Sequence, residues 1–261
     1  MVTKFMNLKK VFCSVILIVS LTSITDAKEN KVKHMTALEK YMLAKDLADE
    51  GDTKAMLDVF TIFYTTYPEL ENKVQEAATY LMQAASNDNI NAQFNMGYLQ
   101  QTGDVFEKNL DKAIVWLKKA SEQGHVKSNR QLGFIYLEKY KANNSDNSLY
   151  IESRKWFSKG AKLGDIPSLR QLASGTLAHE QEGHEEALKM LEEAFGHGDA
   201  RSARYLGIYS IIRFEVYGNE KYYNQAVDWY KKSAMLGDND SISWLQKNSD
   251  KAIVKQPPVK N

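Results

Sequence analysis

Residues 110–124 read Leu-Asp-Lys-Ala-Ile-Val-Trp-Leu-Lys-Lys-Ala-Ser-Glu-Gln-Gly. Ala113, Trp116 and Ala120 stand at i, i+3 and i+7, the spacing of one apolar stripe along an α-helix. Gly124 follows, and glycine is favoured just past a helix end because the left-handed backbone there costs it little. The stretch predicts an amphipathic helix that ends in a glycine turn.

The same arrangement recurs six times: a bulky residue stands eight positions before a Gly or Asp, and Ala or Ser stands four positions after that turn residue. The steps between successive bulky residues are 37, 36, 40, 34 and 39. Such a period is typical of a helical solenoid, and we predict an all-α fold of about five to six helix-turn-helix repeats. Solenoids usually present binding surfaces rather than active sites. The six sets are Leu43–Gly51–Ala55, Tyr80–Asp88–Ala92, Trp116–Gly124–Ser128, Trp156–Gly164–Ser168, Met190–Gly198–Ser202 and Trp229–Gly237–Ser241.

Each repeat has a helix before the glycine turn, here helix B, and a helix after it, helix A. Four of the six turns read Gly-Asp, so we expect the aspartate to cap the following helix A. A small residue recurs inside helix A, where glycine costs about 1 kcal/mol relative to alanine, so we expect close helix crossings there. We assign the three tryptophans of helix B to the core. The small residues are Gly97, Gly133, Ala173 and Gly207, and the tryptophans are Trp116, Trp156 and Trp229.

Residues 92–97 (AQFNMG) followed by residues 111–124 (DKAIVWLKKASEQG) resemble the Sel-1-like repeat, a relative of the tetratricopeptide repeat. Residues 128–133 and 226–237 are similar to it too. The resemblance covers about residues 37–248 and implies a right-handed α/α superhelical solenoid whose A helices line the concave surface. Around residues 55–88 the pattern is degenerate, as expected of an end cap, and Ser241–Leu245 looks like the start of one more helix A.

Two insertions fall between helix A and helix B. Residues 138–148 are polar, and residues 214–223 are rich in aromatic side chains. We expect both to form loops on one rim of the solenoid, with the first mobile.

The chain begins with a stretch typical of a cleaved secretory signal peptide, residues 1–27: a basic start, an apolar run at residues 11–21 and small residues before Lys28. The apolar run is too short to span a bilayer, and no later segment is apolar enough. Cys13 is the only cysteine, so the mature chain has none. We predict a solenoid at 28–250, a flexible tail at 251–261, and a bacterial protein of the periplasm or extracellular space.

The charge balance gives no sign of a nucleic-acid partner. Without residues 1–27, which hold three Lys and one Asp, the net charge changes from +1 to −1. A nucleic-acid-binding domain would carry a basic excess.

The chemistry-bearing residues form no recognisable active site. His179 and His184 stand at i and i+5, whereas the zinc-protease motif needs i and i+4 on one helix face. We find no nucleophile elbow, phosphate loop or CxxC pair, and we expect no enzyme activity, cofactor or metal. Some cysteine-rich members of the family have been linked to β-lactam binding, but this chain lacks their cysteines, so the resemblance does not imply that activity here. The alternative is an envelope enzyme, such as a cell-wall hydrolase or β-lactam-active protein, that pairs His179 with Glu182.

Arginine recurs at one helix-A position in three successive repeats, at Arg130, Arg170 and Arg204, and Phe94 holds that position in the repeat before. Side chains in register stack along a solenoid, and arginine suits carboxylate partners and binding hot spots. We predict a partner-binding stripe of these four residues and Tyr98. The alternative is that each arginine pairs with an acid on a neighbouring helix B and supports packing.

A second helix-A stripe is aromatic, and we expect about two-thirds of its side chains to be buried. Its members are Phe94, Tyr98, Phe134, Tyr205 and Tyr209.

The leading functional hypothesis is an exported protein-interaction scaffold, monomeric, that binds a protein or peptide in the concave groove. Some exported members of the family are immunity partners of toxins or host-interaction factors. A structural adaptor of an envelope complex is a further possibility.

Overall fold

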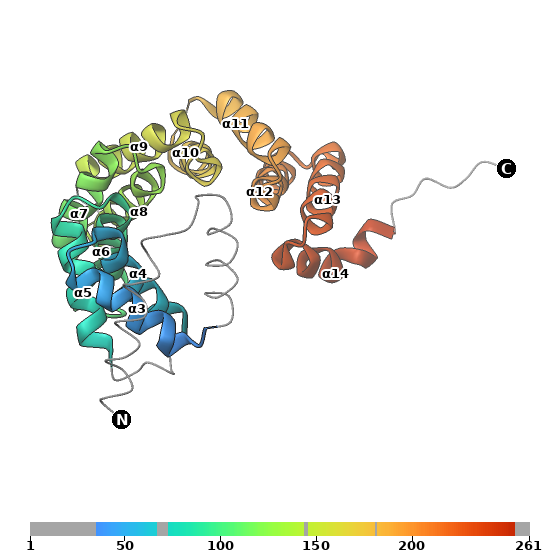
Figure 1. The fold of residues 1–261 in the computed structure, drawn as a ribbon. Helices are drawn as coiled ribbons and strands as arrows, with labels where there is room; N and C mark the ends of the chain where they lie inside the picture. Colours follow the sequence, from blue (N-terminus) through green and yellow to red (C-terminus); the bar gives the residue numbers. More distant parts are fainter. Residues whose placement is uncertain (1–34, 67–72, 144–145, 181, 254–261) are drawn as a thin grey trace, which may run out of the picture. The chain divides into compact units, whose positions relative to one another are not determined.

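The computed structural model describes residues 35–66, 73–143, 146–180 and 182–253. The predicted signal peptide and residues 254–261 lie outside this range. The chain divides into two compact units, Met1–Ala92 and Gln93–Asn261. Within the described residues it forms twelve α-helices and no strand (Figure 1). They are α3 (Ala37–Asp49), α4 (Thr53–Thr66), α5 (Val74–Ser86), α6 (Ile90–Thr102), α7 (Leu110–Glu122), α8 (Val126–Ala142), α9 (Asn147–Lys162), α10 (Ile166–His179), α11 (His184–Gly196), α12 (Ala200–Tyr217), α13 (Glu220–Met235) and α14 (Asn239–Ile253).

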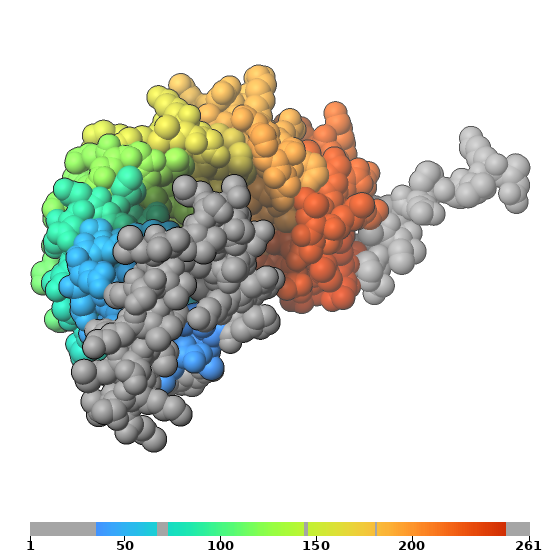
Figure 2. All heavy atoms as spheres, in the orientation of Figure 1, coloured from blue at the N-terminus to red at the C-terminus, as the bar shows by residue number. Residues whose placement is uncertain are grey.

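The helices alternate as the repeat predicts, with α3, α5, α7, α9, α11 and α13 as B helices and the even-numbered ones as A helices. From α7 to α14 each helix packs against the next, and α10 also contacts α12, which is the arrangement of a solenoid. In the second unit α8, α10 and α12 follow one another along one side and α9, α11 and α13 along the other (Figure 1). The space-filling view shows successive helices of this unit in close contact (Figure 2).

The six turns have one geometry. The turn residue is left-handed in every copy, with φ from +60° to +95°, and in five copies it is glycine. The exception is Asp88, the one non-glycine residue with positive φ among those described. The next residue donates its N–H back to the carbonyl five positions earlier, as in His125 to Ala120 at 2.9 Å, which is a Schellman ending.

Capping by the predicted aspartates is confirmed at all four Gly-Asp turns. Asp52 accepts the N–H of Ala55 at 2.9 Å. The other three each accept both the N–H and the hydroxyl of a serine three positions on. The aspartate of each Gly-Asp turn therefore donates its backbone N–H to the end of helix B and caps the start of helix A with its side chain. The three pairs are Asp165–Ser168, Asp199–Ser202 and Asp238–Ser241.

The small residues of helix A receive large side chains from helix B. A Cβ on Gly97 would lie 2.5 Å from Cγ of Leu117, and one on Gly133 would lie 2.6 Å from the ring of Phe157. Gly207 meets the ring of Tyr230 in the same way, at 3.1 Å. The close crossings that the glycines predict are thus present.

The tryptophan assignment is wrong by one residue. Trp116, Trp156 and Trp229 are only partly buried, and the buried residue follows each of them. A lysine ammonium lies over each indole, for example Lys232 at 3.9 Å from the Trp229 ring centre. Helix B packs on an A helix at each side, which buries a wide stripe and leaves the tryptophans at its border. The buried successors are Leu117, Phe157 and Tyr230.

Both insertions lengthen helices instead of forming long loops. Helix α8 continues to Ala142 and α9 begins at Asn147. In the aromatic insertion α12 runs to Tyr217, Gly218 ends it with a left-handed φ of +65°, and Asn219 caps α13. The predicted final helix A is present as α14. No helix in the described ranges is long and apolar enough to span a bilayer.

Candidate interaction surface

The three arginines in register each pair with an aspartate. Arg130 lies 2.7 Å from Asp165, and Nε of Arg170 lies 2.9 Å from Asp199. Arg204 lies 3.5 Å from Asp238 and also pairs with Asp240. Pairing with an acid is what the packing alternative expects.

The acid, however, is not on helix B. Asp165, Asp199 and Asp238 are the residues that cap the next helix A. Each aspartate therefore joins two successive A helices, since it holds the N-terminus of its own helix and the arginine of the helix before. We call these contacts the A-to-A clips. Arg170 is 6% exposed, so its charge is balanced inside the protein by Asp199.

The repeat before the arginines makes the same contact with uncharged rings. Phe94 holds the arginine position, His125 holds the capping position, and their ring centres are 4.4 Å apart. Nδ1 of His125 lies 2.9 Å from the hydroxyl of Ser128. Burial, with Lys127 nearby, lowers the pKa of His125 below its ordinary value, which favours the neutral ring against Phe94.

The last clip also carries a titration shift. Burial alone would raise the pKa of Asp238, but the hydroxyl and N–H of Ser241 together with Arg204 bring it below its ordinary value. The ionised carboxylate that both contacts need is thus the stable form.

The aromatic stripe is less buried than the sequence predicts. None of its five members is buried; four are half-buried and Tyr98 is 38% exposed. Phe94 stacks against Tyr98, with ring centres 6.2 Å apart. Tyr98 is therefore the member of the predicted partner stripe that presents most surface, because the three arginines of that stripe form clips and Phe94 packs on His125.

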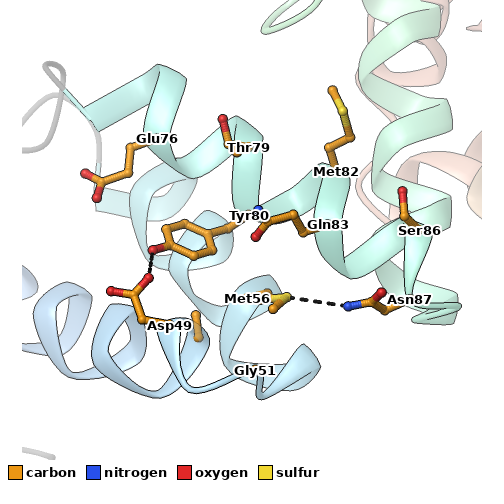
Figure 3. A pocket seen from close by; sticks show the side chains of 11 residues that line it. Asp49, Gly51, Met56, Glu76, Thr79, Tyr80, Met82, Gln83, Ser86 and Asn87 are labelled. Atoms are coloured by element: carbon orange, nitrogen blue, oxygen red, sulfur yellow. Dashed lines mark hydrogen bonds between the residues drawn. The ribbon is translucent and has the colours of Figure 1, made fainter.

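The first unit contains a cavity of about 650 Å³ between α3, α4 and α5. Figure 3 shows Met56, Tyr80 and Asn87 around it, with the Tyr80 hydroxyl donating to Asp49. Burial and this hydrogen bond raise the pKa of Tyr80. Lys45 holds both Asp49, at 2.9 Å, and Glu76, at 3.2 Å, so the acidic groups at the rim are already engaged.

A second cavity, of about 570 Å³, lies beside the last two clips. Arg170 and Arg204 line it together with the aspartates that pair with them, and Arg201 adds an exposed guanidinium. Its charges are largely matched within the protein.

Sequence reasoning missed the most exposed apolar face of an A helix. Ile208, Ile212 and Val216 follow one another on α12 and are 39%, 50% and 67% exposed. Beside them run Tyr209, Arg213 and Tyr217. Arg213 and Tyr217 contact Tyr222 of α13, and Tyr209 packs edge-on against His184 of α11. The i, i+4, i+8 spacing of Ile208, Ile212 and Val216 places them on one face of the helix, but the spacing does not distinguish an exposed face from a buried one.

The two histidines compared with the zinc-protease motif make separate structural contacts. His179 packs edge-on against Tyr150, with ring centres 5.3 Å apart. Nε2 of His184 lies 2.8 Å from the carbonyl of Glu180, and Glu180 pairs with Arg154. Among the described residues no group of three or more His, Cys, Asp or Glu side chains is arranged to hold a metal.

The chain is similar to known repeat proteins. The Sel1 repeat model matches residues 90–125, 149–165 and 217–238. The uncharacterised protein YibG of Escherichia coli K12 is 29% identical over 97 residues, which are 36% of this chain and 61% of YibG, so the chain spans less than two-thirds of that relative.

Among solved structures, a Sel1 repeat protein from Oxalobacter formigenes aligns over 80% of this chain and 89% of its own, with 21% identity and a TM-score of 0.52. The protein c5321 of uropathogenic Escherichia coli, which has the same type of fold, aligns over 77% and 50%, with 23% identity and a TM-score of 0.42. With its recurring turns, its matched repeats and its solenoid of alternating A and B helices, the chain contains Sel1 repeats and has the fold of a Sel1 repeat protein.

Proposed function

We propose that the chain is an exported protein-interaction scaffold, without catalytic activity of its own, that binds a protein or peptide with the exposed face of its A helices. The observation that carries this proposal is that two A helices expose a large apolar side chain at the same register position, six residues after the first buried Ala or Ser of the helix. Tyr98 and Ile208 both hold it, and both leave more than a third of the side chain in solvent. Large apolar groups at matching positions suit partner contacts.

The scaffold holds these side chains in place before a partner arrives. The A-to-A clips fix the spacing of neighbouring A helices, and the large side chains seated on helix-A glycines fix the A-to-B spacing. A preordered surface loses little conformational entropy on binding.

The predicted stripe then divides by role. Tyr98 contacts the partner directly, and Arg130 and Arg204 contribute the part of their side chains that the clips leave in solvent. Arg170 and Phe94 support the surface through Asp199 and His125. The chain acts as a monomer in this proposal.

Export rests on residues 1–27, whose basic start and apolar run fit a signal peptide. The partner is accordingly a protein of the periplasm or of the extracellular space. A secreted toxin that the chain neutralises and a host protein are the two classes that the family resemblance suggests.

Affinity purification tests the proposal directly. Residues 28–261 carrying a tag are incubated with periplasmic and culture fractions of the source organism, and bound proteins are quantified by mass spectrometry. The proposal expects a stoichiometric partner. Tyr98→Ser should reduce its recovery, whereas Ile151→Ser, at a 63% exposed position on a B helix, should not.

The enzyme alternative is tested on the same material. Turnover of muropeptides or of a chromogenic β-lactam that survives in the wild type and disappears in His179→Ala would refute the scaffold proposal.

A further inference from the structure

Helix α12 presents two parallel rows of side chains. Ile208, Ile212 and Val216 form the aliphatic row, and Tyr209, Arg213 and Tyr217 form the second row, one position further along. Residues four apart lie one above the other on a helix, so the rows run side by side. The aliphatic row grows more exposed along the helix, from 39% to 67%, and Tyr217 is 66% exposed.

Arg213 differs from the other partly buried arginines in its surroundings. Its guanidinium lies 4.1 Å from the ring centre of Tyr222 and about 6 Å from those of Tyr209 and Tyr217. Its Nη2 donates to the hydroxyl of Tyr222 at 2.6 Å. Arg130, Arg154, Arg170 and Arg204 each have a carboxylate partner.

In the described part of the chain no carboxylate pairs with Arg213. A half-buried guanidinium without a counter-charge has given up hydration without full compensation. Three tyrosine rings hold its plane in place and leave N–H groups for a further acceptor. A carboxylate is the acceptor that a guanidinium fork fits best.

We propose that the surface formed by both rows and Tyr222, the α12 surface, docks a segment of a protein partner in which an Asp or Glu is flanked by aliphatic side chains. The carboxylate binds Arg213 between the tyrosine rings, and the aliphatic groups cover Ile212 and Val216. This inference rests on the proposed scaffold function and names the chemistry of the bound segment.

The partner chemistry follows from charge as well as shape. The aliphatic row alone would accept any apolar surface. Beside it, Arg213 has no carboxylate partner among the described residues, and an acidic residue of the bound segment would complete that ion pair. A charge-assisted contact at the edge of an apolar patch gives the orientation that apolar contact lacks.

Selection from a random 12-residue peptide phage library on immobilised residues 28–261 tests the inference. We expect enriched peptides that carry an acidic residue within four positions of Leu, Ile, Val or Phe. Synthetic peptides from the enriched pool should lose about tenfold or more in affinity on Arg213→Gln, and Arg213→Lys should recover part of it because the charge remains.

Matched variants separate this surface from others. Val216→Ser removes an exposed aliphatic side chain and should weaken peptide binding several-fold, while Ile151→Ser on α9 should leave it unchanged. Circular dichroism melts confirm that each variant folds. Peptides without an acidic residue, or binding that is indifferent to Arg213→Gln, would overturn the inference.

Two other occupants are outcomes of the same series. Binding to phosphatidylglycerol vesicles with no peptide selected would replace the peptide by a membrane surface, and a dimer in sedimentation that Val216→Ser dissociates would replace it by a second copy. If the purified partner is still recovered by Arg213→Gln and Val216→Ser, the scaffold proposal stands and the α12 inference fails. If the wild type recovers no partner and selects no peptide, both fail.

Discussion

Gly133→Ala is the substitution that best probes how the repeats are joined. The new Cβ would lie 2.6–2.8 Å from three ring atoms of Phe157, closer than real Cβ contacts. Phe157 is 3% exposed, so its ring has no free space to enter. Overpacking a core in this way costs about 1–3 kcal/mol, against about 1 kcal/mol gained from the better helix propensity of alanine. We expect a net loss of about 1 kcal/mol in the free energy of unfolding.

Gly196→Ala is its matched control. This glycine also belongs to a helix, and a Cβ there would meet nothing within 4 Å. The same change should therefore stabilise the protein, by up to about 1 kcal/mol. Urea unfolding followed by circular dichroism at 222 nm measures both. If Gly133→Ala stabilises the protein as much as Gly196→Ala does, the close crossing of α8 and α9 is not what joins them.

Three further predictions concern the turns and clips. Asp199→Ala removes a cap and leaves the buried charge of Arg170 without its partner, so it should cost about 3–4 kcal/mol in urea unfolding, whereas Asp52→Ala removes a cap alone and should cost about 1 kcal/mol; equal losses would refute the clip. Asp88→Gly relieves the left-handed backbone and should stabilise by roughly 0.5–1 kcal/mol, seen as a higher urea midpoint; a lower one would show that the aspartate side chain matters more than the backbone. The folded pKa of His125 lies below its unfolded value of about 6.5, so its stabilising contribution is complete above that pH and is lost as the pH falls below it; His125→Asn should flatten the urea midpoint between pH 7.5 and 5.5, and an unchanged slope would contradict this.

Most of the architecture could be predicted because it is local and repeated. The glycine turn and the capping aspartate act within a few residues, the helix-A glycines meet only the next helix B, and the recurrence along the chain makes the pattern visible. The tryptophans show where this reasoning ends. A 3.6-residue period fixes the apolar stripe but not its centre, so Trp116 and Leu117 are equally plausible core residues until the neighbouring helices are placed.

The interaction surface was harder to predict because its contacts join distant residues. Arg170 and Asp199 were both identified from the sequence, one as a binding residue and one as a cap, yet only the packing of α10 against α12 shows that they form one ion pair. Ile208, Ile212 and Val216 have the spacing of a core stripe, and nothing local shows that they face solvent. The aromatic insertion was expected to loop out, but its residues continue two helices.

Site-specific photo-crosslinking in cells of the source organism tests the central claim, that a protein partner binds the A-helix face. A benzophenone side chain is placed at Tyr98 or Ile212 on A helices, or at Ile151 on a B helix, positions that are all exposed. The account predicts one shared partner adduct from the two A-helix positions and none from the B-helix position. An adduct from Ile151 alone, or from no position while the affinity-purified partner is present, would contradict it.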